Sequence, residues 1–119
     1  MSDSLPDYFQ EGIDLFNAER FFECHEAWEQ VWNRSQGDDK LILQGLIQAA
    51  VAILHLERGN REGANSLYSK ARLKLDLAGK TFKGLDVERF RCELANFFTA
   101  ALCANSDRLP DRPKLNRCF

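Results

Sequence analysis

Long hydrophobic runs are missing from this sequence. The longest apolar stretch, LILQGLIQAAVAILHL at residues 41–56, is interrupted by two glutamines, a glycine and a histidine. A membrane-spanning helix is therefore not expected there. The first ten residues, MSDSLPDYFQ, are acidic and polar, unlike the basic start and apolar centre of a signal peptide. We expect a cytoplasmic protein without a membrane partner.

An excess of positive charge is missing as well. The chain has 16 Lys and Arg residues against 18 Asp and Glu residues, which gives a formal net charge of −2. Proteins that bind nucleic acids or anionic membranes usually carry clustered basic charge. No nucleic-acid partner is therefore expected.

Closely spaced pairs of cysteines are also lacking. The four cysteines are Cys24, Cys92, Cys103 and Cys118. No two of them have the C-x-x-C spacing of a zinc knuckle or a thioredoxin-like site. Because free thiols are the rule in a reducing cytosol, this agrees with a cytoplasmic location.

Apolar residues at helical spacing occupy most of the 119 residues, and almost nothing is typical of a strand. With 45% hydrophobic residues, the chain can bury one small core. The spacing predicts five helices joined by short loops, at residues 8–18, 21–34, 40–58 and 61–78 and after Asp86. Asn60 and Asp86 are expected N-caps. The third helix is apolar nearly all round, which places it at the centre of the bundle.

The last part of the chain changes character. GKTFKG at residues 79–84 is expected to be a loop, and SDRLPDRPKLNRCF at residues 106–119 has two prolines and no periodicity. We expect a single helical domain at residues 1–105 and an extended C-terminal tail at residues 106–119 that could dock as a strap. Leu73 and Leu77 lie opposite the apolar stripe of their helix. Cover by the tail is the expected explanation, and a homodimer or partner surface is the alternative.

A weak internal repeat relates FFECHEAWEQV at residues 21–31 to REGANSLYSKA at residues 61–71. The small–aromatic–small spacing of the second segment resembles the second helix of a tetratricopeptide repeat. Two repeats are too few for a solenoid. The expected fold is therefore all-α, a compact bundle with two repeat-like helical hairpins.

The stretch ECHEAWEQVW at residues 23–32 combines carboxylates, a histidine and two tryptophans. At about 100° per residue, Trp28 and Trp32 fall in the buried arc and are expected to be core anchors. His25 and Glu29 border this arc and, being four residues apart, can touch. Glu26 lies further out, at the rim.

The central helix carries three polar side chains in one narrow sector, Gln44, Gln48 and His55. Each would cost about 1–3 kcal/mol if it were buried without a partner. The preceding helix offers His25 and Glu29 as the nearest partners. We therefore predict a buried or cleft-lining polar pocket formed by His25, Glu26, Glu29, Trp32, Gln44, Gln48 and His55, with Glu26 and Gln44 at its rim.

Three interpretations of this cluster remain open. It is a structural hydrogen-bond network, a site for a small polar ligand or for acid–base chemistry, or a metal site. The last is the weakest, since HEAWE fits neither the H-E-x-x-H signature nor the repeated Glu-x-x-His of di-iron bundles. His25, Glu29 and His55 are only weak candidate ligands. No metal or cofactor is expected, and no catalytic residue is assigned.

Four segments carry a family resemblance: FNAERFFECHEAWEQVW, LQGLIQAAVAILHLERGN, GANSLYSKARLKL and FKGLD. Together they cover roughly residues 9–86. They resemble an uncharacterised, mostly microbial and plastid-lineage family known as domain of unknown function 309. The resemblance implies an all-helical bundle and no established activity. The positions matching the family's motifs are His25, Glu26, Glu29, Trp32, Gln48 and His55.

Two functions of different class follow. In the first, the polar cluster binds a small polar ligand or supports acid–base chemistry. In the second, the chain is a repeat-like scaffold for a protein partner, and the cluster is structural. The two differ in exposure: a ligand site requires His25 and Glu29 to line a cavity that solvent can reach.

Overall fold

The computed structural model describes residues 7–103 and 109–118. These residues form the five helices α1 (Tyr8–Asn17), α2 (Phe21–Trp32), α3 (Gly37–Glu57), α4 (Arg61–Leu75) and α5 (Val87–Cys103). A short 3₁₀ turn, Asp76–Ala78, follows α4, and two short strands precede α5, β1 (Thr81–Phe82) and β2 (Leu85–Asp86). The all-α prediction is confirmed.

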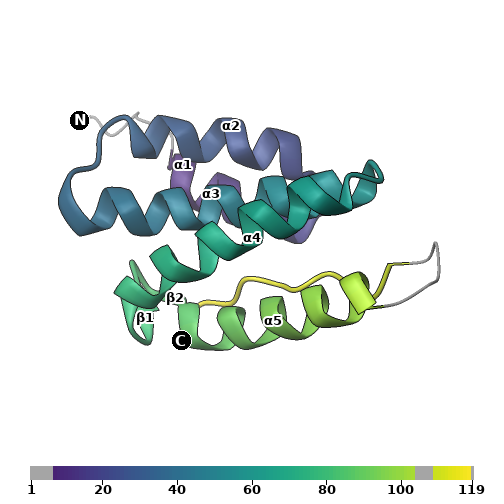
Figure 1. Ribbon diagram of the computed structural model, residues 1–119. Helices are drawn as coiled ribbons and strands as arrows, with labels where there is room; N and C mark the ends of the chain where they lie inside the picture. The colour runs from purple at the N-terminus through teal and green to yellow at the C-terminus, as the bar shows by residue number, and fades with distance from the viewer. Residues whose placement is uncertain (1–6, 104–108, 119) are drawn as a thin grey trace.

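Sequential helices pack as antiparallel neighbours, α1 on α2, α2 on α3 and α3 most extensively on α4. Helix α5 lies along the other side of α4, and the tail runs back beside α5 toward the strands (Figure 1). Whether the first four helices are related to tetratricopeptide repeats remains a prediction.

An aromatic cluster fills the core between α1, α2 and α5. Trp28 and Phe16 are fully buried, and their rings stack with centroids 6.1 Å apart. Phe16 also meets Phe21 and Phe90 edge to face, at 5.1 and 5.4 Å. The indole N–H of Trp28 donates to the carbonyl oxygen of Phe9 at 3.1 Å, so the polar atom of this buried ring has a partner.

Helix α3 is the central helix, as expected. It begins at Gly37, three residues before the predicted start at residue 40, and nine of its residues are buried. Among the described residues, α3 is the one helix long and apolar enough to cross a membrane by length and composition alone. Its position between α2 and α4 accounts for that apolar character by packing.

Both predicted N-caps are present. The Asn60 side chain accepts a hydrogen bond from the Gly63 amide at 2.9 Å. The Asp86 side chain accepts one from the Arg89 amide at 3.0 Å and so caps α5. These contacts satisfy amide groups that lack partners in the first helical turn.

The expected loop at residues 79–84 contains a small antiparallel hairpin instead. Phe82 pairs with Leu85 across a two-residue turn. The turn residues Lys83 and Gly84 both have positive φ, 52° and 79°, as a type I′ turn requires. The hairpin buries the side chains of Phe82 and Leu85, so two short strands cover one end of the core.

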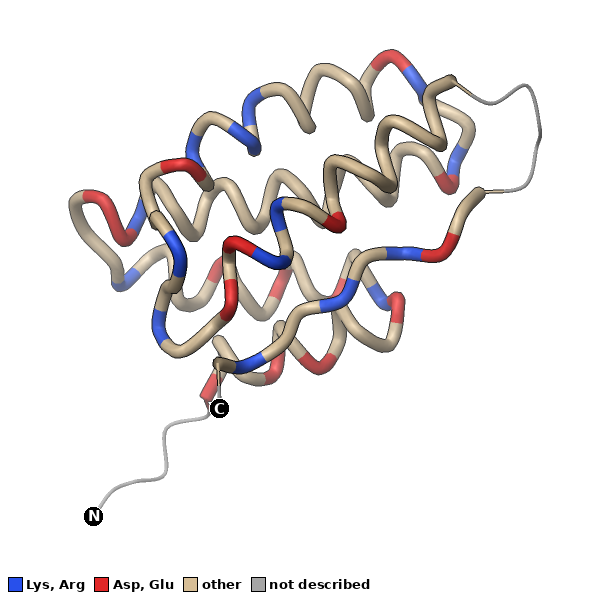
Figure 2. The backbone as a smooth tube through the Cα atoms, turned by 90° about the horizontal axis from the view of Figure 1, so that it is seen from below, with Lys and Arg blue, Asp and Glu red and all other residues tan. Residues whose placement is uncertain are grey.

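The tail docks as an extended strap between residues 109 and 118. Leu115 is buried, and its backbone exchanges two hydrogen bonds with the Asn17 side chain at the end of α1, at 2.8 and 2.9 Å. Arg112 pairs with Glu57 of α3 at 3.0 Å. In Figure 2 this segment runs alongside the helices, and its Lys and Arg positions are blue. The predicted domain boundary at residues 105–106 lies outside the described residues.

The tail does not cover Leu73 and Leu77, and that expectation was wrong. These side chains are 69% and 50% exposed. The strap contacts the ends of α1 and α3 and the hairpin instead, because Asn17, Glu57 and the Lys83 carbonyl hold it there.

Candidate functional site: the outer faces of α2 and α3

His25 and Glu29 form the contact that their spacing predicts. Nε2 of His25 lies 3.2 Å from a carboxylate oxygen of Glu29, and the two side chains are 28% and 52% exposed. No polar or charged residue among the described ones is buried. The pair is therefore solvated and lies at the border of the core.

An exposed aromatic side chain lies beside this pair. Phe22 is 51% exposed, and its ring centroid lies 6.3 Å from that of His25. Because Phe22, Glu26 and Glu29 are four and three residues apart, they form one outer stripe on α2. Glu26 is exposed, like the other two. Sequence reasoning placed Glu29 at the border of the core and Glu26 further out. It did not single out Phe22, although the register of Phe22 with these two residues would have shown it.

The two tryptophans differ in burial. Trp28 is fully buried, which confirms it as a core anchor. Trp32 is half-buried and packs against the core from its edge. The Nζ of Lys40 sits 4.1 Å above its ring, and its indole nitrogen is buried without a hydrogen-bond partner among the described residues.

Gln48 faces α4 rather than α2. Its side-chain oxygen accepts a hydrogen bond from Nζ of Lys74 at 3.1 Å. The expected partners of Gln48, His25 and Glu29, bond to each other instead. Gln44, one turn earlier on the same face of α3, is half-buried.

His55 lies at the end of α3, and its Nδ1 is 3.2 Å from the side-chain nitrogen of Asn60. The described contacts thus give His25 and His55 separate partners, and a single site containing both stays a prediction. Within residues 7–103 and 109–118, no group of three or more His, Cys, Asp and Glu residues could hold a metal ion. The weak candidate ligands His25, Glu29 and His55 are not brought together as such a set.

Lys40 and Lys74 connect the outer residues of α2, α3 and α4 into one surface. Lys40 and Gln44 lie on one stripe of α3, and Lys40 reaches Trp32 of α2. Gln48, on the same stripe, reaches Lys74 of α4. The outer sides of α2, α3 and α4 are therefore continuous here, and their side chains are half-buried or exposed. We use the name α2–α3 face for the surface made by two stripes, Phe22, Glu26 and Glu29 on α2 and Lys40, Gln44 and Gln48 on α3.

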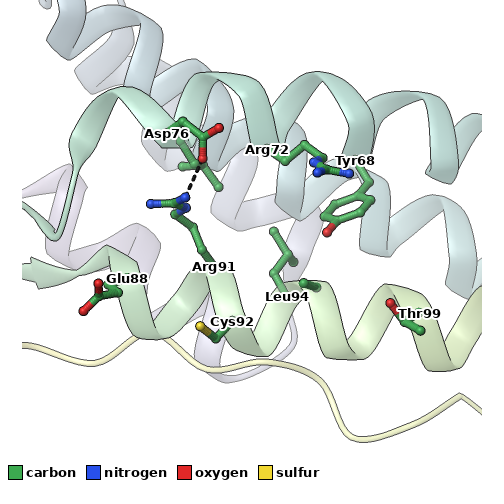
Figure 3. A pocket seen from close by; sticks show the side chains of 10 residues that line it. Tyr68, Arg72, Asp76, Glu88, Arg91, Cys92, Leu94 and Thr99 are labelled. Carbon is green, nitrogen blue, oxygen red and sulfur yellow. Dashed lines mark ion pairs between the residues drawn. The ribbon is translucent and has the colours of Figure 1, made fainter.

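A separate cleft of about 630 Å³ lies between α4 and α5. Tyr68 and Arg72 line it from α4, and Arg91 and Cys92 line it from α5 (Figure 3). Sequence reasoning missed this cleft. Its walls are two consecutive helices, α4 and α5, and helical spacing gives no sign of an open cleft between them.

Fold and surface together define the class of the protein: a small all-helical bundle domain with an open polar face. Residues 9–67 match the model of the family described as "Domain of unknown function (DUF309)". The resemblance seen in the sequence is confirmed for this segment.

A curated relative extends the same comparison. An "Uncharacterized protein" of Aquifex aeolicus (strain VF5) is 28% identical over 80 residues, which are 66% of this chain and 24% of the relative. The chain thus spans about a quarter of the length of that relative. No solved structure matches the chain.

Proposed function

We propose that the chain is a recognition domain whose α2–α3 face binds a segment of a partner protein. The observation that carries the proposal is the outer stripe of α2, where exposed Phe22 is followed by Glu26 and Glu29. Interfaces are typically built around such an aromatic anchor with a polar rim.

The openness of this face favours a protein partner over a small ligand. Small-molecule sites enclose most of the ligand surface in a concave pocket. Here Glu29 is 52% exposed and is already paired with His25. A polypeptide segment can cover such a face by lying along it, as amphipathic helices do in groove complexes.

The charge of α2 indicates the chemistry of the partner. Helix α2 contains Glu23, Glu26 and Glu29 and has no Lys or Arg. Arg20, which precedes the helix, pairs with Glu23 at 2.6 Å. Glu26 and Glu29, the latter with His25 at its side, make the outer stripe of α2 acidic, whereas Lys40 lies on the α3 side of the face. At the α2 stripe, charge complementarity favours a basic amphipathic segment.

A photo-crosslinking residue at position 22 tests this proposal. In the cell of origin, it is expected to crosslink to a segment that carries Lys or Arg around an apolar side chain. The same residue at position 73, where Leu73 is 69% exposed, is the matched control and is expected not to capture this segment. The double variant Glu26→Gln, Glu29→Gln should weaken the complex severalfold at low salt, because it removes both charges and keeps the shape. An acidic captured segment, or one that position 73 captures equally, would contradict the proposal.

A second candidate is a site for a small polar ligand or for acid–base chemistry, with His25 paired to Glu29 and with Gln44, Gln48 and His55 beside them. The 3.2 Å contact of His25 with Glu29 supports it. Glu29→Gln separates the two candidates. Native mass spectrometry of protein from its own cell that shows a small molecule, lost in this variant while the melting temperature holds, would favour the second.

The proposed location is the cytoplasm. All four cysteines are free thiols, which supports a reducing compartment.

A further inference from the structure

The cleft between α4 and α5 is a separate feature of the molecule, since none of its lining residues belongs to α2 or α3. Its volume of about 630 Å³ is in the range of small-molecule sites. Buried Leu75 and Leu94 form its floor, the half-buried Tyr68 and Ala95 form its apolar walls, and the rim is polar. The ring of Tyr68 is held by Phe98, which it stacks against at 4.4 Å and 8°.

Four charged side chains border this cleft, two of each sign, Arg72, Asp76, Glu88 and Arg91. Arg91 is already engaged, because it pairs with Asp76 at 2.5 Å and donates to the Gly79 carbonyl at 3.4 Å. Arg72 and Glu88 form no side-chain ion pair with any residue that the structure describes. The cleft therefore offers one cation and one anion to a ligand.

These two charges are separated along the cleft. Figure 3 shows Arg72 and Glu88 on opposite sides of the Arg91–Asp76 pair. Arg72 on α4 lies four residues before Asp76, which begins the 3₁₀ turn after α4. Glu88 lies three residues before Arg91 on α5, which runs the other way. At 1.5 Å per residue, the offset is roughly 10 Å along the helix axes. An ion pair at each end leaves space for a molecule about two residues long.

We propose that this cleft binds a small zwitterion of dipeptide length. Its carboxylate would pair with the guanidinium of Arg72, which can bind both oxygens at once, and its ammonium group would pair with Glu88. The side chains of the ligand would lie on the half-buried Tyr68 and Ala95. The paired charges Arg91 and Asp76 between them are neutral overall, so neither a simple anion nor a simple cation is favoured.

Cys92 provides a native reporter for this site. It lines the cleft and is exposed, whereas Cys103 is exposed and lies outside the lining. The dipeptide leucyl-phenylalanine is expected to slow alkylation of Cys92 several-fold and to leave the rate at Cys103 unchanged. Both cysteines lie in one tryptic peptide, residues 92–108, so tandem mass spectrometry of this peptide assigns the alkyl group to one or the other. Free leucine should protect much less, because its two charges are too close together.

Derivatives of the dipeptide that lack one charge, together with two variants of the protein, test the proposal. The N-acetyl and C-amide derivatives of the dipeptide each lack one charge and should lose the protection. Arg72→Gln should abolish it, whereas Lys70→Gln, an exposed position on another side of α4, should keep it. Equal protection by the blocked and unblocked dipeptides, protection that survives in Arg72→Gln, or no protection of Cys92 at all would each overturn the proposal.

Discussion

At Gly12 the backbone of α1 approaches Trp28 so closely that no side chain fits. A Cβ at this position would lie 2.1 Å from the indole nitrogen of Trp28. Gly12→Ala must therefore displace the ring and its hydrogen bond to the Phe9 carbonyl. We expect a loss of about 1–3 kcal/mol in unfolding free energy, measured by urea denaturation. Glu11→Ala, an exposed position on the same helix, should change stability by less than about 0.5 kcal/mol. An equal effect of both variants would contradict the close approach.

Cys24 makes stability depend on pH in the alkaline range. Burial raises the pKa of the Cys24 thiol well above its ordinary value. Above the unfolded value of about 8.5 the unfolded chain loses this proton and the folded chain keeps it, so unfolding is favoured as pH rises.

The expected cost of this titration is about 1.4 kcal/mol at pH 9.5 relative to pH 7. Cys24→Ala should lack this part of the decline, whereas Cys103→Ala, at an exposed position, should retain it. Denaturation curves of the three proteins at both pH values measure the difference. If the unfolding free energies of Cys24→Ala and the parent fall by the same amount between the two pH values, the folded state does not shift the titration of Cys24.

At the scale of elements, Asn60 both ends α3 and begins α4. Its side chain accepts from the Gly63 amide and contacts Nδ1 of His55. Asn60→Ala should cost about 1 kcal/mol because the first turn of α4 loses its cap. Asn65→Ala, an exposed position within α4, should be neutral or slightly stabilising, since alanine is the better helix former. Thermal melts of both variants make the comparison, and a similar loss in both would show that the cap contributes nothing special.

At the same scale, the sequence predicted most helices to within a few residues. Helical spacing, Asn60 and Asp86 are local signals, and the structure forms α1, α4 and α5 where these signals predict them. The exception is the hairpin at residues 81–86. Two-residue strands are too short to show an alternating pattern, and the positive φ of Lys83 gives no compositional signal.

For the whole molecule, the tail is the element that joins distant parts. Leu115 is 3% exposed, and its backbone is held by Asn17 from the other end of the chain. Leu115→Ala should cost about 2–4 kcal/mol and make α5 more sensitive to limited proteolysis. Leu73→Ala, on a side chain that is 69% exposed, is the matched control and should stay within about 0.5 kcal/mol. If the tail did not contribute to stability, Leu115→Ala and Leu73→Ala would have similar unfolding free energies.

In the candidate site, contacts within one helix were predictable from the sequence and contacts between helices were not. The contact of His25 with Glu29 follows from one helical turn and was predicted from sequence. The partner of Gln48 was not, because the periodicity of α3 gives the direction of a side chain but not which neighbouring helix lies there. The choice of Lys74 depends on how closely α4 approaches α3 at Gly45, whose Cβ position meets Lys74 and Leu75.

The sequence by itself determined the helical class, the burial of Trp28 and the register of His25 with Glu29, because each depends on residues within a few turns of one another. Only the tertiary structure decided that α5 lies beside α4 with a cleft between them, and that the tail reaches Asn17. Both depend on tertiary contacts between different elements, such as Asp76 with Arg91 and Asn17 with Leu115. Their geometry results from the packing of the whole core, which no local pattern contains.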